Sequence, residues 1–162
     1  MKQGNLFAVT FSAVAVSAAQ DLFELVAAAS SKLVLREVRL GQYSDFGDAA
    51  AELLSVLIIR NYTTSGSGGS AFTPLPFNGI SGARVAVTTA EINNTTVATA
   101  GTPETMVADS FNIATGWLYR PPADERIILE PSKRLVVRVT VPADALTMNG
   151  TLIFEEIGKI PS

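Results

Sequence analysis

Apolar and polar side chains alternate along several stretches of this chain, which is the pattern of β-strands. In the clearest stretch every second position is a leucine or valine, at Leu135, Val137, Val139 and Val141. Successive side chains of a strand point to opposite faces of a sheet, so each such stretch predicts a strand with one buried face.

Similar stretches, separated by turn residues, occur along the whole chain. They predict strands near Leu6–Val16, Leu22–Ala28, Leu33–Leu40, Leu53–Arg60, Arg84–Thr89, Thr105–Ile113, Gly116–Tyr119, Arg126–Leu129, Leu135–Val141 and Gly150–Ile157. Asn149-Gly150 predicts a tight turn before the last strand, and only 48–54 has the composition of a short helical turn. Many short strands with glycine- and proline-rich turns predict an all-β fold, a jelly-roll-type antiparallel β-sandwich. Its length predicts a single domain over residues 1–162.

The stretch 53–60 is apolar at almost every position, and therefore on both faces. A strand that is apolar on both faces must be covered on both. The core of a two-sheet sandwich covers only one, so we expect another subunit to cover the other. The residues predicted to form this oligomer interface are Leu53, Leu54, Val56, Leu57, Ile58 and Ile59.

Between two strand patterns lies a segment rich in glycine, serine and proline. Residues 63–70 have the composition of a flexible linker, and Pro74 and Pro76 exclude a central strand. The sequence predicts one long flexible loop at about 61–82.

The N-terminus permits two interpretations. Lys2, an apolar stretch and Val16-Ser17-Ala18 together imitate a secretory signal. However, Thr10 and Ser12 interrupt the stretch, and its alternation favours a strand. No apolar run approaches the ~18 residues that a membrane helix needs, so we expect no membrane partner.

Composition narrows the functional classes. The chain has no histidine and no cysteine, which excludes thiolate or imidazole metal sites, cysteine nucleophiles and Ser-His-Asp triads. With a net charge of −3 and scattered basic residues, we expect no direct binding of nucleic acid. Only 17% of residues are charged while 48% are hydrophobic, which favours burial of part of the surface by a partner chain.

Carboxylates are the remaining candidates for chemistry. Asp45, Asp48 and Glu52 could supply oxygen ligands to Ca²⁺, but turn chemistry alone explains the segment, so we expect no metal or cofactor. Glu155 and Glu156 are adjacent in a predicted strand and cannot converge on one bond. The pair at 124–125 follows two prolines in a predicted turn, where solvated charge is the expectation.

The single tryptophan, Trp117, has Tyr119 close by. If exposed, the two rings could stack on a sugar. A lone tryptophan in a strand more often plugs one end of a sandwich core.

Several segments together resemble small proteins encoded beside tailed-phage capsid genes. They are 20–25, 40–45, 47–49 with Glu52, 111–113, 116–117, 121–122 and 154–156. The chain resembles phage head decoration (cement) proteins with a jelly-roll, tumour-necrosis-factor-like fold.

This resemblance implies a homotrimer seated on the outside of the capsid, with the major capsid protein as partner and no enzymatic activity. It implies a location on the virion surface after synthesis in the host cytoplasm. Two other classes stay open: a carbohydrate- or receptor-binding module of a phage particle, and an enzyme using carboxylates alone.

Overall fold

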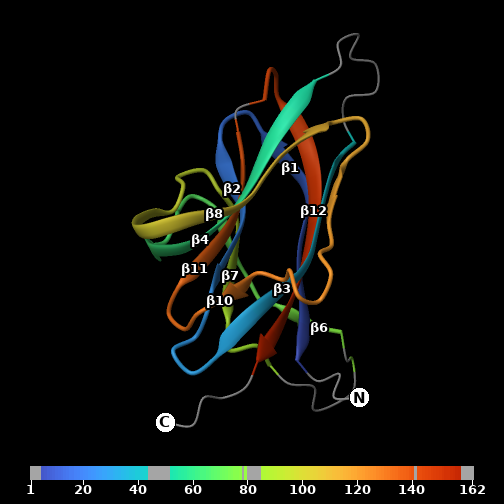
Figure 1. The fold of residues 1–162 in the computed structure, drawn as a ribbon. Helices are drawn as coiled ribbons and strands as arrows, with labels where there is room; N and C mark the ends of the chain where they lie inside the picture. Colours follow the sequence, from blue (N-terminus) through green and yellow to red (C-terminus); the bar gives the residue numbers. More distant parts are fainter. Residues whose placement is uncertain (1–4, 44–51, 78, 80–84, 141, 158–162) are drawn as a thin grey trace.

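The computed structural model describes residues 5–43, 52–77, 79, 85–140 and 142–157 of the chain. This part contains twelve strands in two six-stranded sheets and no helix. The sheets form two layers (Figure 1), and the prediction of an all-β antiparallel sandwich is confirmed.

Each sheet is named here after the strand in it that comes first in the sequence, β1 or β2. The order of the β1 sheet is β10 (Ile128–Leu129), β3 (Lys32–Gln42), β12 (Leu146–Ile157), β1 (Leu6–Val16) and β6 (Leu75–Pro76), and β9 (Trp117–Tyr119) also pairs with β3. The β2 sheet has the order β5 (Ser70–Phe72), β7 (Thr89–Asn94), β2 (Gln20–Val26), β11 (Arg134–Val139), β4 (Leu53–Thr64) and β8 (Thr99–Asn112).

The strand order is that of a jelly roll. The first long strand pairs with the last, β1 with β12, and the second with the second-last, β2 with β11. Further in, β3 pairs with β9 and β10, and β4 pairs with β8, always antiparallel. This nesting is what a long hairpin gives when it rolls into two sheets, which is the jelly-roll arrangement.

The core lies between the sheets and is built from the alternate, inward-facing side chains of both. Its largest fully buried members include Phe7, Phe23 and Phe154. Phe7 stacks on Phe154 with ring centroids 5.6 Å apart, and Phe11 lies 5.1 Å from Phe23 across the layers. Aromatic pairs of this kind add stability beyond the area that they bury.

Asn149-Gly150 is not a turn, contrary to the prediction. Both residues lie inside β12, opposite a bulge in β1 where the register shifts between Phe11 and Val14. The bulged Ala13 has a φ of 58° and donates its backbone N–H to Asn149 Oδ1 at 2.9 Å. The asparagine therefore supports a bulge in the neighbouring strand, a role for which turn statistics give no signal.

The strand predicted at Arg84–Thr89 begins instead at Thr89 and continues to Asn94 as β7. Glu156, buried in β12, accepts the backbone N–H groups of Val87 and Thr88 at 2.9 and 2.7 Å. These donors are thus satisfied by a carboxylate and not by a neighbouring strand. Residue 84 lies outside the described residues, as do 48–51 of the segment for which a helical turn was considered.

The described part of the loop predicted at 61–82, which is 61–77 and 79, is in large part paired. β4 extends to Thr64, β5 pairs with β7, and β6 pairs with the edge of the β1 sheet. Between them Ser67 exchanges backbone hydrogen bonds of 2.9 Å with Thr96. Residues 65–69 therefore form a strap that crosses the outer face of the β2 sheet from β4 to β5. Pro76 lies in an edge strand, as its missing N–H requires.

Candidate interaction surface

The residues predicted as an oligomer interface divide between the two faces of β4. Leu54, Val56 and Ile58 are fully buried in the core between the sheets. Leu53 and Leu57 point outward, and Leu53 is 70% exposed. Leu57 and Ile58 therefore lie on opposite faces, as the alternation predicts.

The outer face of β4 is covered in part by the chain itself. Ile59 is 4% exposed because it packs with Tyr62, Ala98 and Val136, and Leu57 lies against the same cluster. A second subunit is thus not needed to cover Ile59. The apolar side chains that stay well exposed here are Leu53 of β4 and Met106 of the neighbouring strand, which is 42% exposed, while Leu57 is partly buried. Leu53 lies opposite Asn112 of β8, and Leu57 lies opposite Ala108.

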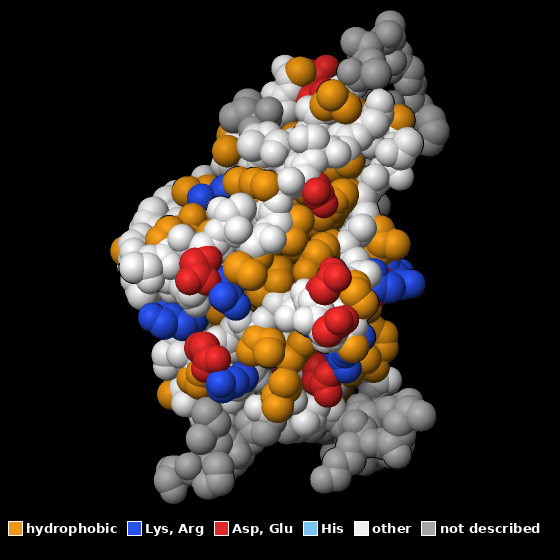
Figure 2. Space-filling view, in the orientation of Figure 1, with side chains coloured by type: hydrophobic (Ala, Val, Ile, Leu, Met, Phe, Trp, Pro, Cys, Tyr) orange, Lys and Arg blue, Asp and Glu red, His pale blue; other side chains and the backbone are white. Residues whose placement is uncertain are grey.

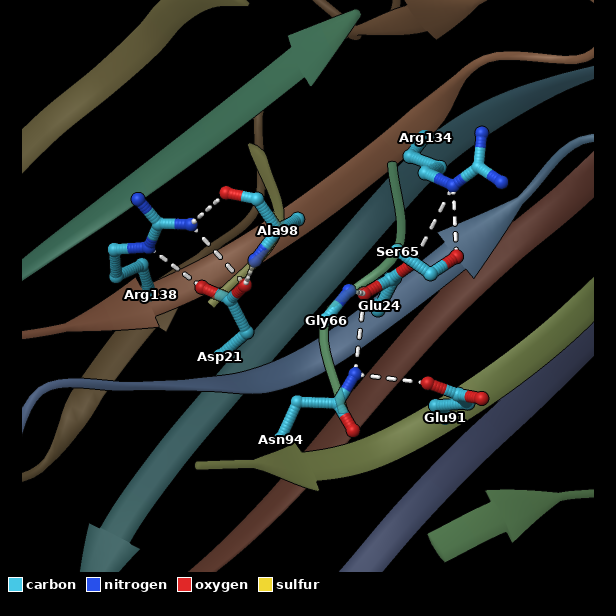
Figure 3. A network of polar contacts seen from close by, with 9 residues as sticks. All are labelled: Asp21, Glu24, Ser65, Gly66, Glu91, Asn94, Ala98, Arg134 and Arg138. Atoms are coloured by element: carbon cyan, nitrogen blue, oxygen red, sulfur yellow. Dashed lines mark hydrogen bonds and ion pairs between the residues drawn. The ribbon is translucent and has the colours of Figure 1, made fainter. Parts of the chain in front are cut away.

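Buried charged side chains hold the strap and the segment around Ala98 onto the β2 sheet (Figure 3). Asp21 accepts hydrogen bonds from Arg138 Nε at 2.6 Å and Arg138 Nη2 at 3.1 Å, and from the backbone N–H of Ala98 at 2.7 Å. Burial alone would lower the pKa of Arg138, but the hydrogen bond and charge of Asp21 raise it above its ordinary value. Bidentate geometry makes this a strong, charge-assisted contact.

A second centre of this network is Glu24. Its Oε2 accepts the backbone N–H of Gly66 at 2.8 Å and Asn94 Nδ2 at 3.1 Å, while Arg134 Nε lies 3.7 Å from Oε1 (Figure 3). Arg134 also donates to Ser65 Oγ at 2.7 Å. Arg134 and Arg138, both in β11, therefore neutralise buried carboxylates within the fold.

The strand β8 forms one edge of the β2 sheet and pairs only with β4 in the described part of the chain. Nearly all of its residues are exposed, from Thr99 to Ser110. Its only carboxylates are Glu104, which pairs with Arg60 at 2.7 Å, and Asp109. A long open edge with few charges offers unpaired backbone groups to another chain.

Beside this edge, side chains of both sheets form a cluster that is named here the aromatic groove and consists of Val107, Asp109, Phe111, Trp117 and Tyr119. The indole of Trp117 stacks on Phe111 with centroids 6.5 Å apart and on Tyr119 at 6.1 Å. Its Nε1 donates to Asp109 Oδ2 at 3.2 Å. Burial raises the pKa of Tyr119, and the charge of Glu125 raises it further.

Figure 2 shows hydrophobic side chains gathered in a band along the middle of this view, with acidic side chains beside them. Trp117 and Tyr119 are partly buried against the core, and the rest of each side chain is exposed. The sequence did not predict that the five residues of the aromatic groove lie together. Its only signal was the alternation of Val107, Asp109 and Phe111 on one face of a predicted strand, where a carboxylate breaks the apolar pattern.

Among the described residues, the adjacent carboxylates Glu155 and Glu156 do not come together. Glu155 pairs with Arg36 at 2.5 Å, while Glu156 is buried on the other face. Glu52 accepts the backbone N–H of Ala143. Asp45 and Asp48 lie outside the described residues, and in the remainder no three metal-ligating side chains cluster. No helix in the described ranges is long and apolar enough to cross a membrane.

No protein-family model matches this sequence, and no curated protein matches it. Among solved structures, it is similar to a chain in a single-particle structure of Maize chlorotic mottle virus. That match has 13% identity and a TM-score of 0.28, over 98% of this chain and 100% of that one.

A chain in a structure of infectious bursal disease virus, strain Gx, has 14% identity and a TM-score of 0.18, over 98% of this chain and 38% of that one. Both similarities are too weak to carry an argument about function. The assignment of this chain to the antiparallel jelly-roll sandwiches therefore rests on its own strand order.

Proposed function

We propose that this protein is a structural component of a bacteriophage particle, which binds the outside of the capsid as a homotrimer and stabilises the head. Its partners are other copies of itself and the major capsid protein. It contacts neither nucleic acid nor membrane, and it works without catalysis, metal or cofactor. It is made in the host cytoplasm and resides on the virion surface.

The observation that carries this proposal is the exposed, nearly uncharged surface of β4 and β8, including Leu53, Leu57 and Met106. Exposed apolar side chains on the face of a sheet are typical of sites where proteins associate. The jelly roll is a recurrent architecture of viral capsid domains, and the sequence resembles decoration proteins. A repeating shell offers many contacts at once, so modest affinity at each site suffices.

Stabilisation would follow from linkage, because a protein that binds only the assembled shell favours that state by its binding free energy. The test compares phage heads with and without this protein. DNA release is followed by dye fluorescence while the heads are heated. We expect release at a higher temperature when the protein is bound.

Equal release temperatures on heads that demonstrably carry the protein would show decoration without stabilisation. Failure to bind heads at all would contradict the proposal. Since the net charge is small, binding should also persist at moderate salt, which screens charge-steered association within a Debye length of ~8–10 Å.

The alternative function is carbohydrate or receptor binding through Trp117 and Tyr119. Their position at an opening of the sandwich favours it. However, Trp117 stacks on both Phe111 and Tyr119, which leaves less ring face for a sugar. Binding on a glycan array, lost in Trp117→Ala but not in Leu118→Ala, would support this alternative.

A further inference from the structure

The aromatic groove and the open edge of β8 lie side by side and offer complementary contacts. The edge provides unpaired backbone donors and acceptors, and the groove provides apolar surface with one carboxylate. Strand addition uses both kinds of contact, since main-chain hydrogen bonds give affinity and side-chain pockets give specificity.

Three residues of β8 face the groove. Val107, Asp109 and Phe111 lie opposite Ile58, Val56 and Leu54 of β4, all three of which point into the core. Directly opposite residues in antiparallel strands share a face. On the groove face, an added strand would therefore lie beside an apolar, an acidic and an apolar side chain in turn: Val107, Asp109 and Phe111.

Asp109 determines the charge of the partner. It is exposed, and it has no cationic partner among the residues that the structure describes; its contact there is the N–H of Trp117. Glu104, by contrast, is already neutralised by Arg60. A lysine or arginine beside Asp109 would complete an ion pair, and a carboxylate there would be repelled.

A second copy of this chain fits the edge poorly. Antiparallel pairing of β8 with another β8 centred on Asp109, Ala108 or Ser110 would place Asp109 opposite itself, Val107 or Phe111, respectively. The first arrangement opposes like charges, and the others set a charge against an apolar side chain. These registers of self-pairing are thus disfavoured, a known use of charges in edge strands.

We infer that the edge of β8 binds an extended peptide segment of another protein, whose side chains on the groove face alternate aliphatic, basic, aliphatic. The basic side chain pairs with Asp109. The aliphatic side chains lie beside Val107 and Phe111, against Trp117. On the outer face the segment meets the small side chains of Ala108 and Ser110, which accept any uncharged neighbour.

Trp117 makes the test direct, because it is the only tryptophan of the chain and its emission reports on this groove. The probe is the capped peptide Thr-Val-Thr-Lys-Thr-Val-Thr, and its control has glutamate in place of lysine. We expect saturable blue-shifted emission with the lysine peptide only. Hydrogen exchange should slow in β8 on binding, but not in β6 at the edge of the other sheet.

Asp109→Asn keeps the acceptor for Trp117 and removes the charge. It should weaken binding of the lysine peptide by about two- to fivefold, the range of an exposed ion pair. Glu130→Gln removes a similarly exposed carboxylate, the partner of Lys32, and should leave binding unchanged. The difference between the two variants should shrink at high salt.

Equal binding of both peptides, or no response to the lysine peptide, would overturn the inference. Unchanged affinity in Asp109→Asn would overturn it as well. A response to cellopentaose but not to peptide would assign the groove to a saccharide. Emission that changes with protein concentration alone would assign it to a second copy.

Discussion

At the scale of single residues, the stability of the β2 sheet depends on charges placed where water cannot reach them. The side chain of Asp21 is 0% exposed and that of its partner Arg138 is 17% exposed. Both oxygens of Asp21 are hydrogen-bonded to Arg138, and Arg138 also lies 5.2 Å from the ring centroid of Tyr62. The pair joins β2 to β11 and holds Ala98 against the sheet.

Arg138→Met should destabilise the protein by about 3–5 kcal/mol, because it leaves the buried carboxylate of Asp21 without a counter-charge. Arg36→Met is the matched control. Its partner Glu155 is nearly a third exposed, so we expect a loss of about 0–1 kcal/mol. Urea denaturation of both variants measures the difference, and equal losses would contradict this account.

Glu37 gives the protein a defined response to acid. Its pKa lies below the ordinary value of 4.5, first because Arg120 donates a hydrogen bond to it and also because of Arg39, while burial opposes the shift. A carboxylate whose pKa is lower in the folded state stabilises the fold above the unfolded pKa. That contribution is lost as the pH falls through the folded pKa.

Glu37→Gln should therefore be less stable than the natural protein at neutral pH, and the gap should close below pH 4.5. Both arginines are more than half exposed, so the effect should be small and should diminish with salt. Denaturation midpoints measured across this pH range test the prediction. A gap that is constant with pH would mean that the charge of Glu37 is not involved.

At the scale of elements, β12 depends on a position without a side chain. A Cβ on Gly150 would lie 2.4 Å from Cε1 of Phe11 and 2.9 Å from Cζ of Phe23. Gly150→Ala should therefore cost about 1–3 kcal/mol through overpacking of this pair. Gly41, in the adjacent β3, has nothing within 4 Å of its added Cβ, so Gly41→Ala should be neutral or stabilise by roughly 0.5–1 kcal/mol. Thermal melts of the two variants should shift in opposite directions or differ clearly in size.

How far sequence predicts an element depends on what satisfies its backbone. β1 was predicted with the bounds that it has, Leu6–Val16, because its alternation reflects a sheet with one buried face. The start of β8 was missed, since Gly101 and Pro103 are typical of turns but are tolerated in an edge strand. The strap was predicted to be a flexible loop because a segment rich in glycine and serine is typical of flexible linkers. Gly69 instead permits close approach: its Cβ would lie 2.2 Å from the carbonyl oxygen of Ile92.

The candidate surface was predicted only in part for a related reason. Hydrophobicity identified β4 as doubly apolar, but it could not show that Tyr62 and Ala98 of the same chain cover Ile59. The contact between Ile59 and Ala98 joins residues far apart in sequence. The groove likewise depends on β8 and β9 belonging to different sheets, which no local pattern encodes.

At the scale of the whole molecule, the proposed homotrimer predicts different effects of an aspartate introduced at Ile58 and at Leu53, both in β4. Ile58 is fully buried between the sheets, so Ile58→Asp should unfold the domain, since an unpaired charge in the core is too costly. Leu53→Asp should instead leave the fold intact and dissociate the oligomer, because this side chain is 70% exposed in the single chain. Leu118, 56% exposed on the other sheet, supplies the matched control.

Sedimentation at low micromolar concentration distinguishes these outcomes, with the melting curve of each variant as the check on folding. The natural protein and Leu118→Asp should sediment as the same oligomer, and Leu53→Asp should sediment as a folded species of 17.1 kDa. If the natural protein is a monodisperse monomer, the homotrimer is wrong. If Leu53→Asp stays oligomeric while Leu118→Asp dissociates, the subunits associate through the β1 sheet and the outer face of β4 and β8 is left free for the capsid.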